Sequence, residues 1–356
     1  MSKYIINGLA RIMAGRYIAG DTLQSVVACH RRLTKNLLYN SSSSYNSNRN
    51  NVYSNNPNKI GLIIDYIDEG TNPELYNNEC VNAAMLDTTH TLGYRVPIMV
   101  AVKASGLGLL PTSDIEEIKR AIDKLDIICE AARMSGNKVT IDAETVAFQP
   151  VVDMLTNTVL DRHMTRVYYD RSDIDSVSEN DNKNVKLSQM GDTHIYKTMQ
   201  MYRKDSVNEL NEFISQYPHA GVKLVRGAYY NEDYKTGYLH DKKEDTDRAY
   251  YRGTRMLYNN TWGAKGQYII ASHNKDSVYD TIKMEYMKEP NYGNRNRFNY
   301  AQLLGMGDEL GRAILRVEIN DMVLYKYVPY GPLDVAVPYL VRRLYENWKM
   351  LKYIKP

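Results

Sequence analysis

Short apolar runs alternate with longer stretches of helical spacing along most of this chain, from Lys59 onward. This alternation is typical of parallel strands joined by helices. Eight strands alternating with helices is the number that closes a parallel barrel, so we predict an α/β fold of the (βα)8, or TIM-barrel, type. An open doubly wound sheet is the alternative, although such sheets usually have fewer strands. The predicted strands are Ile60–Asp65, Pro97–Lys103, Val139–Ala143, Thr193–Gln200, Gly221–Arg226, Tyr268–Ser272, Arg297–Leu303 and Met322–Tyr327.

The predicted helices follow these strands and precede the first of them. Within the barrel they cover Pro73–Leu86, Ser113–Met134, Asp205–Gln216, Asp245–Tyr258, Asp276–Met287 and a terminal helix from near Leu333. Residues 1–38 show helical spacing as well, and we expect one or two amphipathic helices there, with Asp21 as an N-cap. Residues 1–20 contain Lys and Arg but no acid, so a mitochondrial presequence and a first helix both stay open.

Residues 41–58 are rich in Ser and Asn and too polar to bury anything, so we expect a loop there. The expected organisation is therefore an N-terminal helical arm with this loop over 1–58, followed by the barrel over 59–356.

Composition excludes several classes of function. The 356 residues include 45 basic and 42 acidic ones, a net charge of +3 that gives no argument for nucleic-acid binding. The three cysteines are far apart and odd in number, which argues against a disulfide framework. No window approaches about 18 continuous apolar residues, so we expect no membrane span. No HExxH or Cys/His ligand spacing and no GxGxxG after a strand are present, so neither a metal site nor a Rossmann site is indicated.

Polar residues suited to binding or catalysis stand at or just after each predicted strand end. They are Asp65, Lys103, Asp142, Gln200, Arg226, His273, Gln302 and Tyr327. Singly, each has a structural explanation; Lys103 could reach solvent from its strand end and Asp142 could cap the next helix. Chemistry in a (βα)8 barrel collects at these carboxyl ends, and together the eight residues favour a site there.

The terminal helix carries two adjacent arginines, Arg342 and Arg343. Neighbours on a helix point about 100° apart, so both cannot lie on a solvated face while the apolar residues around them are buried. A guanidinium binds carboxylate or phosphate as a planar fork, so an inward pair indicates an anionic ligand. A basic last turn that complements the helix dipole explains the pair equally well.

A second motif ends the fifth predicted strand. Lys223 and Arg226 lie three residues apart and are followed by Gly227 and Ala228, where the backbone can approach a flat or phosphorylated ligand. A strand with two solvated cations is the structural alternative, and burial of barrel strands on both faces argues against it.

Five motifs in order resemble the proline dehydrogenase (proline oxidase) family. They are Lys-Leu-Val-Arg-Gly-Ala-Tyr (223–229), Ala-Ser-His-Asn (271–274), Gln-Leu-Leu-Gly-Met (302–306), Tyr-Lys-Tyr-Val-Pro-Tyr-Gly-Pro (325–332) and Tyr-Leu-Val-Arg-Arg-x-x-Glu-Asn (339–347). Order and spacing agree from about Ile60 to Asn347, and Ala14–Asp21 resembles the start of the eukaryotic branch. The resemblance implies a distorted barrel that binds FAD without a Rossmann domain. It also implies oxidation of L-proline to Δ1-pyrroline-5-carboxylate by hydride transfer to flavin N5, with electrons passed to a membrane quinone.

The resemblance further implies a role for individual residues. The substrate side comprises Arg342 and Arg343 on the carboxylate, Lys103 assisting them, Tyr229, Leu303 and Tyr327 shaping the pocket, and Glu69 gating it by pairing with Arg342. Lys223 would lie near flavin N5, and the remaining cofactor contacts would be Gln200, Val225, Arg226, Gly227, Ala228, Ser272, His273, Asn274 and Glu346, with Lys243 and Thr246 on the adenine side. Asp142 would offset the buried ammonium of Lys103.

One departure and several alternatives remain. The family usually has Gly-Ala-Tyr-x-x-x-Glu, whereas this chain has Asp233, which leaves the contact of that carboxylate open. A hydroxyproline dehydrogenase is a close variant, although Tyr327 should crowd a 4-hydroxyl group. A Schiff-base aldolase using Lys103 or Lys223 is a second enzyme class, and a barrel without activity is the non-enzyme alternative. The expected location is the mitochondrion, at the matrix side of the inner membrane, and a bacterial cytoplasm or inner membrane is the alternative. Peripheral contact with the membrane is expected.

Overall fold

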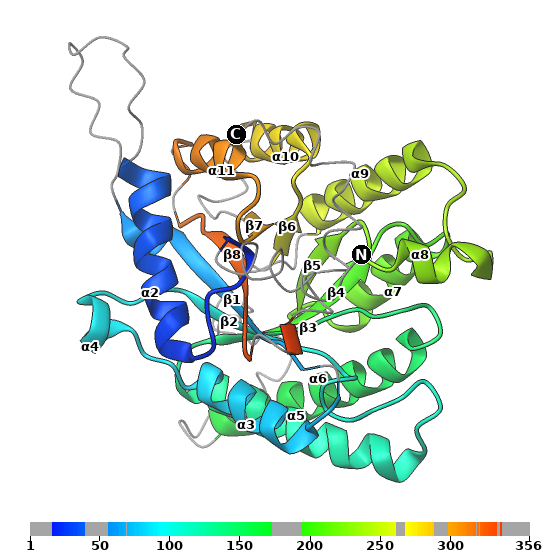
Figure 1. The fold of residues 1–356 in the computed structure, drawn as a ribbon. Helices are drawn as coiled ribbons and strands as arrows, with labels where there is room; N and C mark the ends of the chain where they lie inside the picture. The colour runs from blue at the N-terminus through cyan, green and yellow to red at the C-terminus, as the bar shows by residue number, and fades with distance from the viewer. Residues whose placement is uncertain are drawn as a thin grey trace, which may run out of the picture.

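The computed structural model describes residues 16–39, 56–68, 70–172, 194–260, 268–287, 298–317, 319, 321–332 and 335–336. Its centre is a closed barrel in which β1 to β8 are parallel and follow one another in sequence order (Figure 1). The predicted (βα)8 barrel is therefore confirmed. The strands are β1 Ile60–Tyr66, β2 Ile98–Val102, β3 Lys138–Ile141, β4 Ile195–Gln200, β5 Gly221–Val225, β6 Tyr268–Ala271, β7 Phe298–Leu303 and β8 Leu324–Tyr330.

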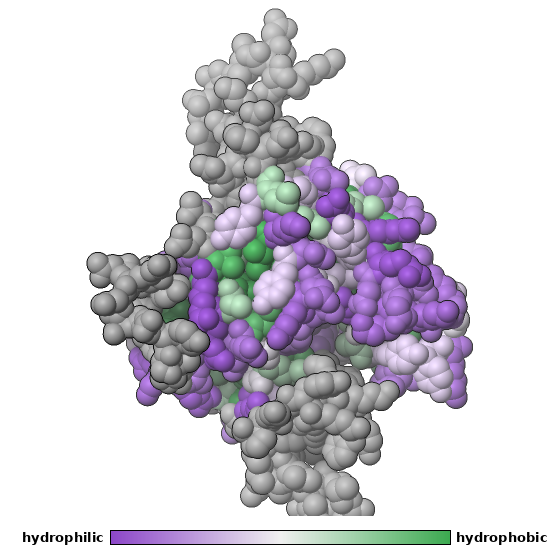
Figure 2. Space-filling view, turned by 90° about the horizontal axis from the view of Figure 1, so that it is seen from above, coloured by the Kyte–Doolittle hydropathy of each residue, from purple (hydrophilic) through white to green (hydrophobic). Residues whose placement is uncertain are grey.

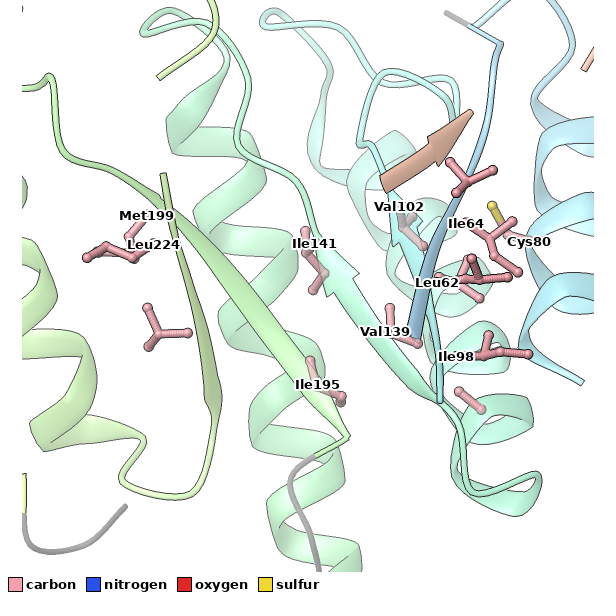
Figure 3. Packing of buried hydrophobic residues seen from close by; sticks show 14 of the residues in the cluster. Leu62, Ile64, Cys80, Ile98, Val102, Val139, Ile141, Ile195, Met199 and Leu224 are labelled. Atoms are coloured by element: carbon pink, nitrogen blue, oxygen red, sulfur yellow. The ribbon is translucent and has the colours of Figure 1, made fainter. Parts of the chain in front are cut away.

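The strands are almost continuously buried because the barrel interior covers one face and the helices cover the other. Alternate residues therefore serve two different cores. The interior core comprises Ile63, Met99, Ala101, Tyr196, Ile269, Ala301 and Tyr325. The outer core lies between strands and helices, and Figure 3 shows part of it, where Leu62 and Ile64 of β1 lie beside Cys80 of α3.

Helices begin where the sequence supplies caps. Asp114 and Glu117 form a reciprocal capping box at the start of α5, and Asn72 followed by Pro73 opens α3. The helices of the barrel are α3 Pro73–Ala84, α4 Thr89–Leu92, α5 Ile115–Met134, α6 Gln149–Ser172, α7 Ser206–Gln216, α8 Tyr230–Asp233, α9 Lys243–Asn259, α10 Lys275–Tyr286 and α11 Asp308–Leu315. Short helical turns are η1 Lys35–Tyr39, η2 Pro57–Lys59 and η4 Tyr234–Thr236.

The N-terminal arm closes the side of the barrel. Helix α2, Leu23–Thr34, packs against β1 and β8 and covers the seam between the first and last strands (Figure 1). Its N-cap is Thr22, whose hydroxyl accepts a hydrogen bond from the Ser25 amide, so the prediction of Asp21 was wrong by one residue. Thr22 has the extended backbone that lets a side-chain oxygen reach the first turn.

Strand β8 runs three residues beyond the predicted end and includes Pro329. A proline cannot donate to the ladder of a central strand. Beyond Tyr327, however, β8 pairs with β1 and no longer with β7. The N-terminal arm takes the vacated edge: the Ala19 amide donates to the Pro329 carbonyl at 2.9 Å, and the Gly331 amide donates to the Gly20 carbonyl at 3.0 Å.

The described surface seen from above is mainly hydrophilic, with hydrophobic side chains gathered near the middle of the view (Figure 2). Among the described residues, no helix combines the length and the apolar character needed to cross a membrane. Most of the Ser/Asn-rich segment lies outside the described residues, and the predicted domain boundary at residue 59 stays a prediction.

Candidate active site

Five side chains from β1, β2, β3, β5 and β8 meet at the carboxyl ends of the strands. Lys103, which follows β2, forms an ion pair with Asp65 and donates to the Tyr327 hydroxyl at 3.3 Å. Asp142, which follows β3, forms an ion pair with Lys223 and accepts a hydrogen bond from the Tyr327 hydroxyl at 2.8 Å. The structure thus brings together four of the predicted strand-end residues, Asp65, Lys103, Asp142 and Tyr327, with Lys223 of the motif that ends β5; Asp65 is the one to which the family resemblance gave no role.

The ring of Tyr327 lies beside the two lysines of this cluster. The Nζ atoms of Lys103 and Lys223 are 5.9 and 5.4 Å from the ring centroid. The Lys103 Nζ is also 3.3 Å from the hydroxyl oxygen, so it lies off the hydroxyl edge of the ring and not over its face. The hydroxyl, bonded to Lys103 and to Asp142, therefore fixes the orientation of the ring at the mouth.

The counter-charge bonded to Lys103 is Asp65, only 1% exposed, rather than Asp142 as predicted. Asp142 is bonded to Lys223 instead because β3 and β5 direct these two side chains toward each other across the mouth. Burial alone would lower the pKa of Lys103, but the carboxylates of Asp65 and Asp142 raise it above the ordinary lysine value. Burial would raise the pKa of Asp142, yet the ammonium groups of Lys223 and Lys103 bring it below its ordinary value. Both groups are thus charged at neutral pH.

Glu144 belongs to the same region, and the sequence reasoning gave it no role. Its Oε1 atom accepts a hydrogen bond from the Ser105 amide at 2.9 Å, which ties the loop after β3 to the loop after β2. Burial raises the pKa of this carboxyl, and the hydrogen bond opposes that shift. Its position two residues after Asp142, on the same side of an extended segment, is the signal that could have revealed it.

Asp233 resolves the contact that the sequence left open. Its carboxylate accepts from the Tyr202 hydroxyl at 2.9 Å and from the Val146 amide at 3.1 Å. The Asp233 amide in turn donates to the Tyr229 carbonyl at 2.9 Å. The buried carboxylate therefore joins the loops after β3, β4 and β5 and positions the turn that carries Tyr229.

Gly227 is the residue on which this turn depends. Its φ is +134°, a conformation that side chains rarely adopt, and a Cβ atom placed there would lie 2.5 Å from the Tyr202 ring. The Tyr202 ring thus packs directly on the glycine backbone. The group that lies against the Gly227 backbone is an aromatic ring of the protein, and the predicted approach of a ligand stays a prediction.

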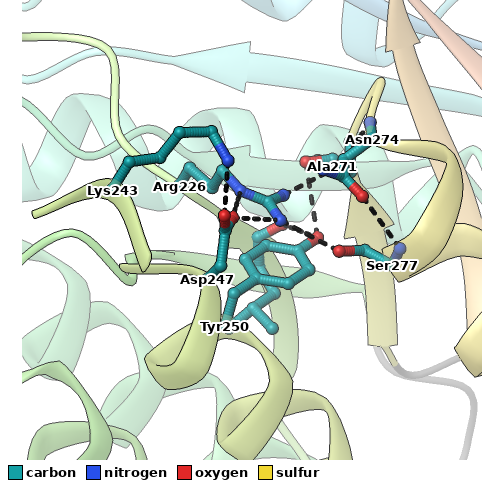
Figure 4. Close-up of polar contacts among 9 residues, drawn as sticks. Arg226, Lys243, Asp247, Tyr250, Ala271, Asn274 and Ser277 are labelled. Carbon is teal, nitrogen blue, oxygen red and sulfur yellow. Dashed lines mark hydrogen bonds and ion pairs between the residues drawn. The ribbon is translucent and has the colours of Figure 1, made fainter. Parts of the chain in front are cut away.

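Arg226 is fixed by four neighbours (Figure 4). It donates to Asp247 at 2.9 Å, to the Ser272 hydroxyl at 3.0 Å and to the Ser277 hydroxyl at 2.9 Å. Its guanidinium carbon lies 4.3 Å from the centroid of the Tyr250 ring. A guanidinium bonded along its edges and stacked on one face has a single orientation, with the other face left for a planar partner.

The remaining predicted cofactor residues lie on β5, β6 and α9, the elements that also hold Arg226 and its partners. Val225 ends β5, Ser272 and Asn274 follow β6, and Lys243 and Thr246 lie in the first turn of α9. Asn274 also caps α10 by accepting from the Ser277 amide, and Lys243 pairs with Asp247, so both have structural roles. Leu303 ends β7 in register with Tyr327. Ala228 lies in the turn after β5.

Three buried polar atoms near the strand ends have no hydrogen-bond partner within the described part of the chain. They are Oε1 of Gln200, the last residue of β4, Nδ1 of His273, which follows β6, and Nε2 of Gln302, near the end of β7. Buried polar groups are nearly always paired, so atoms of this kind indicate where a ligand supplies the partner. Gln302 lies outside the mouth, where its Oε1 accepts from Lys326 on the outer face of the barrel at 2.9 Å, and Nδ1 of His273 faces the backbone of Gly307. Of the three atoms, Oε1 of Gln200 is therefore the one that indicates a ligand at the mouth.

Four predicted site residues lie outside the described residues: Glu69, Arg342, Arg343 and Glu346.

A closed (βα)8 barrel with a charged cluster at the carboxyl ends of its strands has the architecture of a barrel enzyme. The sequence model of the proline dehydrogenase family matches residues 49–355. This chain therefore belongs to the proline dehydrogenase family.

Individual relatives are more distant. Proline dehydrogenase 2, mitochondrial, of Arabidopsis thaliana is 29% identical over 257 residues, which cover 68% of this chain and 48% of that protein. Hydroxyproline dehydrogenase of Rattus norvegicus is 27% identical over 260 residues, which cover 69% and 51%. The chain thus spans about half the length of these curated relatives.

The fold matches solved structures as well. The crystal structure of proline utilization A from Bdellovibrio bacteriovorus inactivated by N-propargylglycine has a TM-score of 0.69 and 18% identity, and the match covers 94% of this chain and 32% of that chain.

Proposed function

We propose that this protein is an FAD-dependent proline dehydrogenase. In this proposal it oxidises L-proline to Δ1-pyrroline-5-carboxylate by hydride transfer to flavin N5, and the electrons then pass to a quinone. Family membership supports the reaction. The observation that carries the site is the convergence of Lys103, Asp142, Lys223 and Tyr327 on one mouth.

The charges at this mouth determine which cations remain to pair with the substrate carboxylate. Asp65 with Lys103 and Asp142 with Lys223 form two ion pairs, so the four groups together have no net charge to offset the substrate carboxylate. A buried anion requires a paired cation. We assign that pairing to Arg342 and Arg343, with Lys103 assisting and Glu69 as the acid that neutralises Arg342 when no substrate is bound.

The ring of proline would then lie against Tyr327, Tyr229 and Leu303. Orienting the donor carbon and anchoring the carboxylate away from it are the main tasks of the protein, because hydride transfer needs little acid or base catalysis. Tyr327 is suited to this positioning because its hydroxyl donates to Asp142 and accepts from Lys103, which fixes the ring. Lys223, paired with Asp142, would place a positive charge beside the cofactor.

The residues present fit FAD. The Oε1 of Gln200 is buried without a partner, and the oriented guanidinium of Arg226 adds a planar donor group. When bound, FAD supplies the two-electron acceptor that no amino-acid side chain provides. We assign its binding to Gln200, Lys223, Val225, Arg226, Gly227, Ala228, Lys243, Thr246, Ser272, His273, Asn274 and Glu346.

Relatives named for hydroxyproline and proline have similar identities to this chain, so identity does not decide between the substrates. We propose that proline is preferred, because the Tyr327 ring is held firmly and would crowd a 4-hydroxyl group. The ratio of kcat/KM for L-proline over 4-hydroxyproline should exceed one, and the reverse ratio would refute this assignment. An aldolase that uses Lys103 is disfavoured by the raised pKa of this lysine, because Schiff-base formation requires a neutral amine. Borohydride trapping of a carbonyl substrate would test the alternative at Lys223.

A relative from Arabidopsis thaliana is named as mitochondrial, and we propose the matrix side of the mitochondrial inner membrane as the location of this protein. A bacterial membrane is the alternative, and fractionation of cells that express the full chain would distinguish them. The quinone and a peripheral membrane contact are part of the same proposal.

The test of the function is an absorbance scan of the purified protein with and without L-proline. We expect a flavin spectrum that bleaches on addition of L-proline, and turnover when an artificial quinone is supplied. Protein that neither carries flavin nor acquires a flavin spectrum with added FAD would contradict the proposal.

A further inference from the structure

Lys326 is a fully buried lysine that the proposed chemistry does not use. Its neighbours Tyr325 and Tyr327 face the barrel interior, so Lys326 projects from the outer face of β8. The side chain is 0% exposed. Its Nζ donates to Gln302 Oε1, the Met306 carbonyl and Asp308 Oδ1, each at 2.9 Å. An ammonium group has three N–H donors, so every one is used.

The three acceptors lie at the end of β7, in the turn between β7 and α11, and at the start of α11, so Lys326 bonds this whole turn to β8. The same turn packs against His273. The Leu303 amide donates to His273 Nε2 at 3.1 Å. A Cβ atom on Gly307, whose φ is +67°, would lie 2.6 Å from His273 Nδ1. The imidazole is therefore enclosed between the end of β7 and the backbone of the turn that Lys326 holds.

The hydrogen bond from the Leu303 amide determines which nitrogen of the His273 ring carries the proton. An imidazole nitrogen that accepts an N–H carries no proton, so the neutral ring has its proton on Nδ1. A second proton would have to bind at Nε2, where it would face the Leu303 amide and break this bond. Leu303 ends β7 in register with Tyr327, so loss of the bond would release a residue at the mouth.

We propose that Lys326 is a positioning residue for Leu303. Its buried ammonium holds the turn after β7 and, as a fixed positive charge, opposes a second positive charge on His273, so that Nε2 stays free to accept the Leu303 amide proton. The link to substrate binding rests on the function proposed above, whereas the link between Lys326 and His273 does not.

The charges around His273 agree with this assignment. Lys326 on β8 and Asp308 on α11 act on the ring with opposite signs, Gln302 on β7 is neutral, and Arg226 is bonded to Ser272 next to it. Burial, and next Lys326, lower the pKa of His273 to about 4, while Asp308 opposes the shift.

The test is an NMR titration of the full chain labelled at histidine Cε1, with His273 assigned from a His273→Asn sample. In the wild type we expect the His273 resonance to keep the shift of a neutral ring from pH 8 to pH 5. In Lys326→Met the titration midpoint should rise by at least about one pH unit, because the repulsion is lost and Asp308 is left unpaired. Wild-type His273 that titrates like an ordinary histidine would overturn the proposal.

Two further variants separate charge from packing. Lys326→Arg retains the charge, so its His273 resonance should keep the shift of a neutral ring from pH 8 to pH 5, as in the wild type. A titration like that of Lys326→Met would assign the effect to packing and refute the charge mechanism. Lys197→Met removes another buried, outward-facing ammonium, which is paired with Asp153 on the far side of the barrel, and should leave His273 unchanged. If Lys326→Met does not fold, the ¹⁵N shifts of wild-type His273 still decide: a proton on Nε2 instead of Nδ1 would overturn the proposal.

Steady-state kinetics connect the ring to the reaction. In Lys326→Met, KM for L-proline should rise as pH falls through the new midpoint, with a smaller change in kcat, while Lys197→Met follows the wild type. A KM that shifts equally at all pH values would reduce Lys326 to a structural role. Absence of proline turnover in the wild type would refute the proposed function but leave the NMR result decisive for Lys326 and His273.

Discussion

The hydroxyl of Tyr327 donates to Asp142 Oδ2 at 2.8 Å across the mouth of the barrel, between strands that are not neighbours. The same carboxylate forms an ion pair with Lys223, and the same hydroxyl accepts from Lys103 at 3.3 Å. Tyr327 therefore connects the two ion pairs of the site. Removal of its hydroxyl should alter the hydrogen bonding of Lys103 directly and that of Lys223 through Asp142.

Replacing Tyr327 with Phe keeps the ring and removes this connection. A hydrogen bond to a charged group contributes about 1.5–3 kcal/mol, so we expect kcat/KM for L-proline to fall by about tenfold or more. Steady-state assays with an artificial quinone would measure the loss. Activity equal to that of the wild type would show that the hydroxyl has no part in positioning.

Tyr330→Phe is the matched control. Tyr330 lies on the same strand and donates to the Glu79 carboxylate at 2.9 Å, but on the outer face of the barrel. Its loss should lower the free energy of unfolding and leave kcat/KM nearly unchanged.

A second prediction concerns the partner of Lys103. Asp65→Asn would leave a largely buried ammonium without its bonded carboxylate, so we expect the free energy of unfolding to fall by about 2–4 kcal/mol. The pKa of Lys103 is raised in the folded state, so the stability it contributes is fully present below the unfolded pKa and is lost only when pH rises through the folded pKa. Burial raises the pKa of the Asp65 carboxyl above its ordinary value, so the pair weakens when pH falls toward that pKa. The loss in the variant should therefore be the same from pH 7 to pH 9 and smaller in acid.

Urea unfolding at several pH values within that range would measure the effect. Glu116→Gln serves as control because its partner Lys119 and Glu116 itself are exposed, so the change should stay below about 0.5 kcal/mol. Similar losses in the two variants would contradict a special role for Asp65.

The sequence predicted the barrel and much of its mouth because both depend on local patterns. Strand positions follow from apolar runs, and strand ends mark the mouth in any (βα)8 barrel. Pairing across the mouth was not predictable in the same way: Lys103 is bonded to Asp65 and Asp142 to Lys223, and that choice depends on side-chain directions in three dimensions. The expected set of polar strand-end residues also failed at Gln302, because alternation along β7 turns it outward to Lys326.

Tyr202 was missed for the same reason. It belongs to no recognised motif, yet its hydrogen bond to Asp233 positions the turn that carries Tyr229. The exchange of Glu for Asp was visible in the sequence, whereas its partner Tyr202 appears only when β4 and β5 are placed side by side.

A third prediction addresses Gly227. Gly227→Ala would force a side chain into a left-handed conformation with its Cβ 2.5 Å from the Tyr202 ring, so we expect a loss of at least about 2 kcal/mol of stability and reduced FAD content. Gly237 also has a positive φ, +78°, but nothing lies within 4 Å of the position of a Cβ atom. Gly237→Ala should therefore cost only about 1 kcal/mol and leave FAD content unchanged. Thermal unfolding and the flavin-to-protein absorbance ratio would measure both, and equal losses would contradict the packing argument.

The last prediction concerns acid stability and uses His194, which precedes β4 and lies outside the mouth. Its Nε2 is 3.2 Å from Nδ1 of His163, whose Nε2 is 2.9 Å from Asp126 Oδ1. Burial, and next the neighbouring His163, lower the pKa of His194 to about 4. In the unfolded state His194 binds a proton near pH 6.5. Between pH 6.5 and pH 4 the unfolded state therefore binds more protons than the folded state, so the free energy of unfolding must fall as pH drops through this window. In His194→Gln the drop in unfolding free energy from pH 7 to pH 4.5 should be smaller than in the wild type by roughly 1–3 kcal/mol, measured by urea unfolding. His90→Gln, at an exposed position in α4, should follow the wild-type curve, and a similar flattening in both variants would show that His194 is not the group responsible.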